Sequence, residues 1–171
     1  GGSAWNCTVS KNTAYDGGGL YLQYGGSANN CLIYGNSATD TGGGARFSQD
    51  GTMINCTVAG NRAVNGGGGV YCYQGGTNLN CIIYFNTTNG VANNWTINGS
   101  GSRFVSNCTT PALPGDIMIV TDDPRLMNLA AGDCRLKPGS PCIDDAQNHL
   151  ASGANDLAGN PSPLEVKVFG S

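Results

Sequence analysis

The dipeptide Asn-Cys recurs five times at nearly constant intervals, and this period constrains the fold more than any other feature. The cysteines are 24, 25, 25 and 27 residues apart, at Cys7, Cys31, Cys56, Cys81 and Cys108. Runs of three or more glycines recur in phase with them, with triplets at 17–19, 42–44 and 67–69. Two unrelated motifs on one period form an internal repeat, and periods of roughly 20 to 50 residues indicate a stacked architecture.

Inside each repeat, apolar positions alternate with polar ones. Val58 lies two residues after Cys56, and Val70 and Cys72 flank Tyr71. This period of two predicts short strands with one face inside, so Tyr21, Arg46 and Tyr71 should align on the outside. Asn12, Asn36, Asn61 and Asn86 and recurring glycines are expected at sharp corners. The pattern predicts an all-β parallel β-helix of about 25 residues per coil. Leucine-rich repeats share the period but require a leucine pattern that is missing here.

Each coil contributes one asparagine and one cysteine at the same phase. We expect an amide ladder along the stack, formed by Asn6, Asn30, Asn55, Asn80 and Asn107. The five cysteines are expected to form one interior column of small buried side chains, since free cysteine is among the most buried residue types. Disulfides between adjacent coils are the alternative, and they require strict geometry.

The composition changes after the coils. Residues 1–110 are predicted to form the stack, with an inserted polar loop near 89–106 that accounts for the 27-residue interval. All seven prolines lie at or after Pro111, and a ladder strand cannot lose its N–H. Residues 111–171 are therefore predicted to be a C-terminal capping region with a terminal strand. The chain is expected to start in mid-coil, either naturally or at a fragment boundary.

Low charge excludes several functional classes. Only 11% of residues are charged and the net charge is −3, so there is no basic footprint for nucleic acid. No apolar run approaches the roughly 18 residues of a membrane span. Cys134 and Cys142 lie outside the column and are the best disulfide candidate. With one histidine and no CxxC pair, zinc is disfavoured, and we expect no metal or cofactor. The candidate glycosylation sequons are at Asn86, Asn94 and Asn98.

The repeat Asn-Cys-Thr-Val with the glycine triplet and a following tyrosine resembles right-handed parallel β-helix proteins of bacterial surfaces. These include polymorphic outer-membrane-protein repeats and choice-of-anchor Q proteins. The segments 121–124, 130–136, 138–144 and 156–161 strengthen the likeness, because in that family such a run closes the β-helix. The resemblance implies an extracellular or cell-surface location. The stretch 164–169 departs from the usual family ending.

Two functional hypotheses follow. The first is a non-catalytic structural or adhesive protein that self-associates, for example as a head-to-tail filament, through apolar Trp5 and a terminal strand carrying Leu164, Val166 and Val168. The second is a module that binds or degrades polysaccharide, in which Tyr21, Arg46 and Tyr71 contact sugar. Catalysis is disfavoured because the regular coils contain only Asp16, Asp40 and Asp50 as carboxylates, whereas a glycosidase needs a facing pair.

Overall fold

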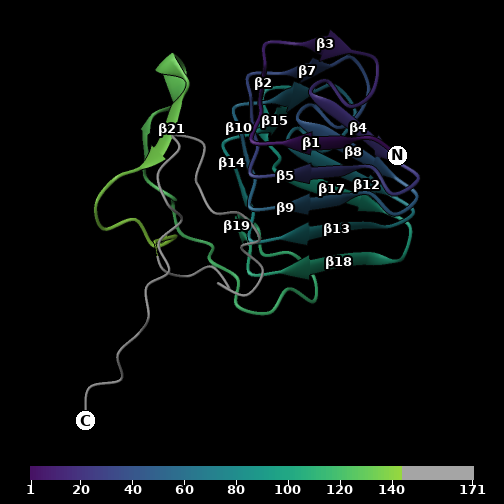
Figure 1. Cartoon of the computed structure of the whole chain (residues 1–171). Helices are drawn as coiled ribbons and strands as arrows, with labels where there is room; N and C mark the ends of the chain where they lie inside the picture. Colours follow the sequence, from purple (N-terminus) through teal and green to yellow (C-terminus); the bar gives the residue numbers. More distant parts are fainter. Residues whose placement is uncertain (144–171) are drawn as a thin grey trace.

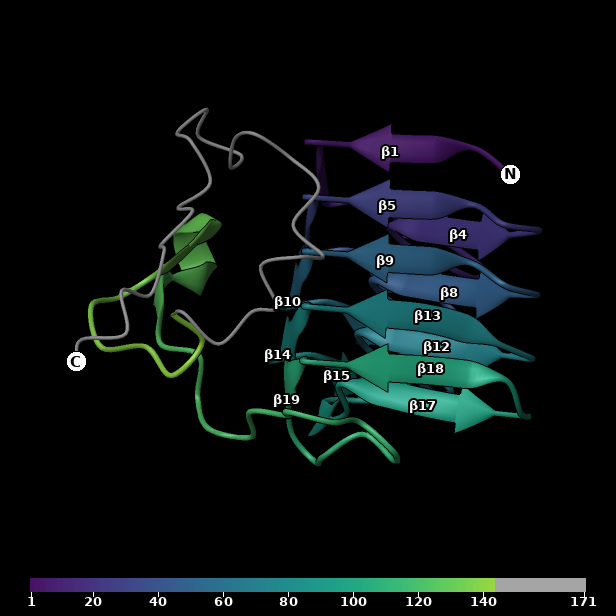
Figure 2. The same cartoon turned by 60° about the horizontal axis from the view of Figure 1, so that its bottom comes forward.

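The computed structural model describes residues 1–143, which form a parallel β-solenoid with a short C-terminal appendage. Successive coils lie on one another, so strands far apart in sequence are neighbours in space (Figures 1 and 2). Every strand pair in the coils is parallel except β15–β16. The predicted parallel β-helix with about 25 residues per coil is confirmed.

Four sheets run along the stack, with one strand per coil in each except the third, where β15 and β16 come from the same coil. The first sheet contains β1 (Ser3–Trp5), β5 (Ser27–Asn29), β9 (Thr52–Ile54), β13 (Gly76–Leu79) and β18 (Ser102–Val105). The second contains β2 (Thr8–Ser10), β6 (Leu32–Tyr34), β10 (Thr57–Ala59), β14 (Ile82–Tyr84) and β19 (Cys108–Thr109). The third contains β3 (Thr13–Ala14), β7 (Ser37–Ala38), β11 (Arg62–Ala63), β15 (Thr87–Thr88) and β16 (Val91–Ala92). The fourth contains β4 (Leu20–Gln23), β8 (Ala45–Ser48), β12 (Val70–Tyr73) and β17 (Trp95–Asn98).

The core is one continuous column inside the four sheets. Apolar side chains fill most of the inward positions, and Asn78 on β13 and Thr109 on β19 are fully buried polar exceptions. The largest fully buried apolar side chains are those of Phe47, Ile33, Met53, Ile83 and Val58. Each glycine triplet lets adjacent coils approach closely. A Cβ at Gly68 would collide with the backbone of Thr87, and one at Gly43 with that of Arg62. The triplets therefore recur because only hydrogen fits between the coils at this corner.

The amide ladder lies at another asparagine position than the sequence predicts. Asn36 and Asn61 are buried, and the Oδ1 of Asn61 accepts from both the backbone N–H and the side-chain amide of Asn36. The same pair of hydrogen bonds, from a backbone N–H and a side-chain amide to one Oδ1, links Asn12 to Asn36, Asn61 to Asn86, and Asn86 to Asn94. The residues assigned to corners thus form the ladder, which is exposed at Asn12 and buried at Asn36, Asn61 and Asn86.

The asparagines assigned to the ladder form corners instead. Asn6, Asn30, Asn55 and Asn80 have φ of 51°, 51°, 54° and 51°, in the left-handed region that asparagine tolerates. Asn80 Nδ2 donates to Asn55 Oδ1 at 3.2 Å. They turn the backbone ahead of each cysteine. The predicted amide contact between coils is present at Asn55 and Asn80, whereas the continuous ladder lies at Asn36, Asn61 and Asn86.

The cysteine column is interior but contains three of the five expected residues. Cys31, Cys56 and Cys81 are each 1% exposed, whereas Cys7 in the first coil is exposed. The neighbouring Cys56 thiol and burial raise the pKa of Cys31, and burial raises the pKa of Cys72, on another sheet, to about 12.

The last coil shifts register, so Cys108 leaves the column. Leu79 pairs with Val105 and Ile82 with Cys108, which places Asn107 beneath Cys81. The Oδ1 of Asn107 accepts from the Cys81 N–H at 3.0 Å, and its Nδ2 donates to the Asn78 carbonyl. An amide therefore ends the thiol column, and Asn107 is not part of the asparagine ladder either.

The expected insert near 89–106 is mostly regular coil. Asn89 and Gly90 both have positive φ and make a tight turn, so β16 folds back on β15. β17 then pairs with β12 at the usual offset, Trp95 with Val70. Paired residues of the two coils are 25 positions apart up to Asn98, which pairs with Tyr73. They are 26 positions apart from Ser102, which pairs with Gly76. One extra residue and the shift of Cys108 together account for the 27-residue interval.

The segment after the coils covers the last coil in part and then runs along the flank. Ile117 and Val120 form bridges with Val105 and Cys108. The hairpin of β20 (Leu126–Asn128) and β21 (Asp133–Leu136), joined by the 3₁₀ helix η1 (Leu129–Ala131), lies beside the second sheet (Figure 2). Leu129 approaches Gly60, Gly132 lies against Tyr34, and the Tyr84 hydroxyl donates to the Thr121 carbonyl. The predicted terminal strand at 164–169 lies outside the described residues.

Candidate functional site

The outer face of the fourth sheet gathers tyrosines around one arginine. Register pairing places Tyr21, Arg46 and Tyr71 side by side on β4, β8 and β12, as the alternation predicts. The Arg46 guanidinium carbon lies 5.6 Å from the Tyr21 ring centroid, 5.4 Å from that of Tyr71 and 5.5 Å from that of Tyr73. These distances are within cation–π range. We call this surface, with residues Tyr21, Arg46, Tyr71 and Tyr73, the tyrosine face.

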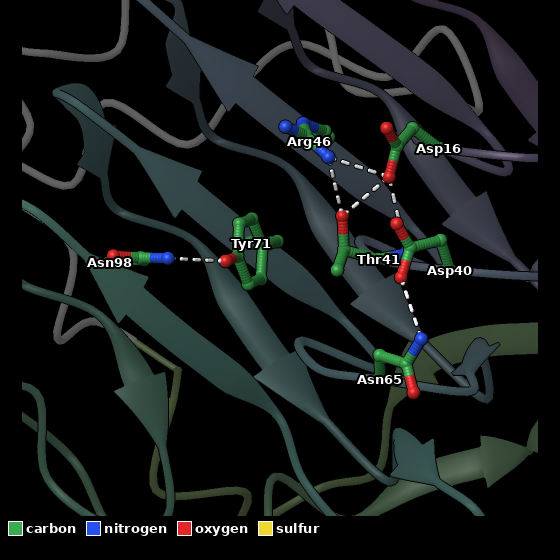
Figure 3. Close-up of polar contacts among 7 residues, drawn as sticks. All are labelled: Asp16, Asp40, Thr41, Arg46, Asn65, Tyr71 and Asn98. Carbon is green, nitrogen blue, oxygen red and sulfur yellow. Dashed lines mark hydrogen bonds and ion pairs between the residues drawn. The ribbon is translucent and has the colours of Figure 1, made fainter.

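Arg46 is fixed by an ion pair as well as by the rings (Figure 3). Its Nη1 lies 2.6 Å from Asp16 Oδ1 and donates to Thr41 Oγ1 at 2.7 Å. The Thr41 hydroxyl and backbone N–H both donate to the same Asp16 oxygen. The side chains of Arg46 and Asp16 are only 15% and 21% exposed. The Arg46 side chain is therefore held in place among the rings, and its charge is neutralised by Asp16. The alternation alone implied an ordinary exposed arginine.

Further polar contacts hold the edges of the face. Asn98 Nδ2 donates to the Tyr71 hydroxyl at 2.9 Å, and Asn65 Nδ2 donates to Asp40 Oδ1 at 2.8 Å (Figure 3). Tyr15 stands beside the face, and the nearby Asp40 carboxylate raises the pKa of its phenol. Asp16 and Asp40 give this region more negative than positive charge.

The aromatic rings remain accessible despite these contacts. Tyr21 is 45% and Tyr73 36% exposed, and Tyr71 is half-buried. Tyrosine offers rigid, amphipathic contact area at a low conformational-entropy cost. The face thus presents a partly exposed aromatic surface flanked by carboxylates and amides, which suits a ligand with apolar C–H faces and hydroxyl groups.

Sequence reasoning missed Asp16, Thr41 and Tyr73 as members of this site. Asp16 and Thr41 are 25 residues apart and each directly precedes a glycine triplet, so the period places them in adjacent coils. The 25-residue spacing alone therefore predicts that the two residues are neighbours. The relationship was not recognised because the two positions carry different residue types.

Two of the three candidate glycosylation sites are buried. Asn86 is 0% and Asn94 3% exposed, and both side-chain nitrogens donate hydrogen bonds inside the stack. A glycan on either nitrogen would break the ladder, so these two predictions are wrong. Asn98 is exposed, with its Nδ2 on the Tyr71 hydroxyl.

The remaining candidate residues lie away from the tyrosine face. Trp5 ends β1 and is 51% exposed, whereas Leu164, Val166 and Val168 lie outside the described residues. Cys134 and Cys142 are both partly exposed, and the structure draws no disulfide between them within residues 1–143. Their pairing stays a prediction. Burial raises the pKa of Cys134 to about 11.

Within the described part of the chain, no three histidine, cysteine or acidic side chains converge as a metal site. No helix in residues 1–143 has the length and hydrophobicity needed to cross a bilayer. The sequence matches no protein-family profile, and comparison with curated proteins and solved structures gave no significant match.

Proposed function

We propose that this protein is a non-catalytic, adhesive β-solenoid of the bacterial cell surface that binds neutral polysaccharide on the tyrosine face. The observation that carries the proposal is the cluster of three tyrosines around the neutralised Arg46. Carbohydrate rings pack their C–H faces on aromatic rings, and the flanking Asp40, Asn65 and Asn98 offer acceptors and donors for hydroxyls. The resemblance to bacterial surface β-helix proteins supports the location.

The charge of the face selects the ligand. Asp16 neutralises Arg46, and Asp40 adds a further carboxylate beside Tyr15. A polyanionic chain would meet net repulsion there, whereas a neutral glycan would not. Tyr21 and Tyr71 are two coils apart, or about 10 Å at the usual strand spacing. That distance lets one extended glycan contact both rings.

The test is binding to a panel of neutral and anionic polysaccharides, measured by pull-down and calorimetry. Wild type should bind neutral chains, and Tyr21→Ala with Tyr71→Ala should weaken binding about tenfold or more. Tyr24→Ala is the matched control, because Tyr24 is an exposed tyrosine outside the cluster. Equal binding by all variants would contradict the proposal.

Degradation of the polysaccharide is the second candidate function, favoured by one observation. The Thr41 N–H donates to Asp16 Oδ1, so Asp40, the residue before Thr41, lies next to Asp16 (Figure 3). The ion pair to Arg46 opposes a role for Asp16 as general acid, because a proton donor must first be protonated. Release of reducing ends that is lost in Asp40→Asn would establish this activity instead.

A further inference from the structure

The tyrosine face changes its chemistry from coil to coil along the solenoid axis. Tyr21, Arg46 and Tyr71 pair side by side in one outward column, and each belongs to a different coil. A phenol ring in the first coil is thus followed by a guanidinium in the second and by another ring in the third. Because adjacent strands are about 4.8 Å apart, the column has a period of two coils that a linear ligand can match.

The middle of this column keeps hydrogen-bonding atoms for a ligand. Nη1 of Arg46 is bound to Asp16 and Thr41, whereas Nη2 of Arg46 has no partner within residues 1–143 and reaches the surface. Arg46 and Thr41 both bind Oδ1 of Asp16, so its Oδ2 is left as an acceptor. A guanidinium and a carboxylate side by side can hold two neighbouring hydroxyls of one sugar, because the first donates and the second accepts.

Other polar groups of the face form columns parallel to the first. On one side, the Asp40 N–H donates to the Tyr15 carbonyl and the Asn65 N–H donates to the Asp40 carbonyl. On the other side, Tyr73 pairs with Asn98, and the two sides flank the Arg46 contacts in Figure 3. A ligand that lies along the solenoid axis therefore has donors and acceptors on both flanks in successive coils.

An extended β-1,4-linked glycan has a repeat that fits this column. Its rise per sugar is close to the strand spacing of about 4.8 Å, so one sugar can lie on each coil. Consecutive sugars in such a chain are turned over relative to one another, so equivalent groups recur at every second sugar. The column of ring, guanidinium and ring has the same period. Chains with α-1,4 or β-1,3 linkages coil, and they do not keep this period along a straight line.

We propose that the tyrosine face binds an uncharged β-1,4-linked glycan along the solenoid axis with one sugar per coil, an arrangement that rests on the proposed binding of neutral polysaccharide. The first and third sugars pack their C–H groups on Tyr21 and Tyr71. The second sugar presents two neighbouring hydroxyls to Arg46 and Asp16. A trisaccharide is the shortest chain that reaches both rings, and a fourth sugar lies over Thr96, which pairs with Tyr71 in the next coil.

Calorimetry with oligosaccharides of defined linkage and length tests the chain type. The probes are β-1,4-linked oligomers of glucose, mannose and N-acetylglucosamine, and α-1,4- and β-1,3-linked oligomers of glucose. In the β-1,4-linked series that binds most tightly, affinity should rise at least about tenfold from disaccharide to trisaccharide, because the third sugar adds the second ring contact. The α-1,4- and β-1,3-linked trisaccharides should bind at least about tenfold more weakly.

The outcomes separate this inference from the proposed function. Equal affinity for all linkages, or no rise at the trisaccharide, would overturn the β-1,4-linked chain while binding of neutral polysaccharide stands. The same holds if no oligomer binds but neutral polysaccharide does. Only the loss of neutral polysaccharide binding as well would overturn the proposed function.

A single-ring variant and a longer chain test the register. Tyr71→Ala should lower the affinity for the trisaccharide to about that for the disaccharide, whereas Tyr24→Ala, outside the cluster, should leave the rise unchanged. In NMR spectra, lengthening the bound trisaccharide to a tetrasaccharide should newly perturb the Thr96 amide. New perturbations that instead run along β12 to Gln74 would show a chain parallel to the strand and would overturn the axial direction.

Discussion

The side-chain carbonyl of Asn61 accepts two hydrogen bonds from Asn36 in the coil before it, one from the backbone N–H at 2.9 Å and one from the side-chain amide at 3.0 Å. The Nδ2 of Asn61 in turn donates to the Ile33 carbonyl and to Asn86. Each buried asparagine thus satisfies the corner of the coil before it. These hydrogen bonds between coils are buried, so water cannot replace them if one partner is lost.

Asn61→Leu should therefore lower the free energy of unfolding by about 3 kcal/mol or more. The change leaves two buried donors of Asn36 without an acceptor, at roughly 1–3 kcal/mol each. Asn55→Gly is the control, because Asn55 is a left-handed corner residue that glycine can replace at about 0.5 kcal/mol. Denaturant titration measures both. A larger loss for Asn55→Gly would reverse the roles assigned here.

Arg46→Ala should cost about 1.5–3 kcal/mol of stability. The change removes three cation–π contacts and leaves the Asp16 carboxylate, which is mostly buried, without its counter-ion. An ordinary exposed arginine would cost under about 0.5 kcal/mol, which is the result expected for exposed Arg62→Ala. An equal decrease in melting temperature for the two variants would contradict a stabilising role for the Arg46 contacts.

Gly68→Ala should prevent the coils from closing at that corner, with a loss of about 3 kcal/mol or more. A Cβ there would overlap the Thr87 backbone, which cannot move without separating adjacent coils. Gly2→Ala has open space around the new methyl group and should be neutral. Circular dichroism melts distinguish the two, and a stable Gly68→Ala protein would contradict the close approach.

Asp116 should make stability fall as the pH rises through its folded-state pKa. Burial raises the pKa of this carboxyl, whose Oδ2 accepts from the Asn107 side chain at 2.8 Å. Between the ordinary pKa and the raised one, the folded chain binds more protons than the unfolded chain, so stability decreases with pH in that window. Asp116→Asn should remove this component from the pH profile of unfolding. A profile identical to wild type would contradict it.

The period and the alternation predict the solenoid because both follow from coil-on-coil packing. They correctly place Tyr21, Arg46 and Tyr71 in one outward column. The choice between the two asparagine columns could not be made from spacing, since both repeat every 25 residues. It depends on which column turns the backbone and which points inward, and the left-handed φ of Asn55 and the burial of Asn61 decide it.

The site was harder to predict because its parts differ from coil to coil. Asp16 and Thr41 occupy equivalent positions in adjacent coils, but one is an acceptor and the other a donor. The site therefore has no repeated residue type that the sequence pattern could reveal. The shift at Cys108 was likewise hidden, because an Asn-Cys dipeptide at nearly the right interval resembles the earlier copies. Only the pairing of Ile82 with Cys108 reveals that Asn107 takes the interior position.

The most direct test of the adhesive function is to map a neutral oligosaccharide onto the protein by NMR chemical-shift perturbation. The account predicts perturbed amides on β4, β8 and β12, centred on Tyr21, Arg46 and Tyr71, and their loss in Tyr21→Ala with Tyr71→Ala. Perturbations confined to another sheet, or none with any neutral glycan, would contradict it.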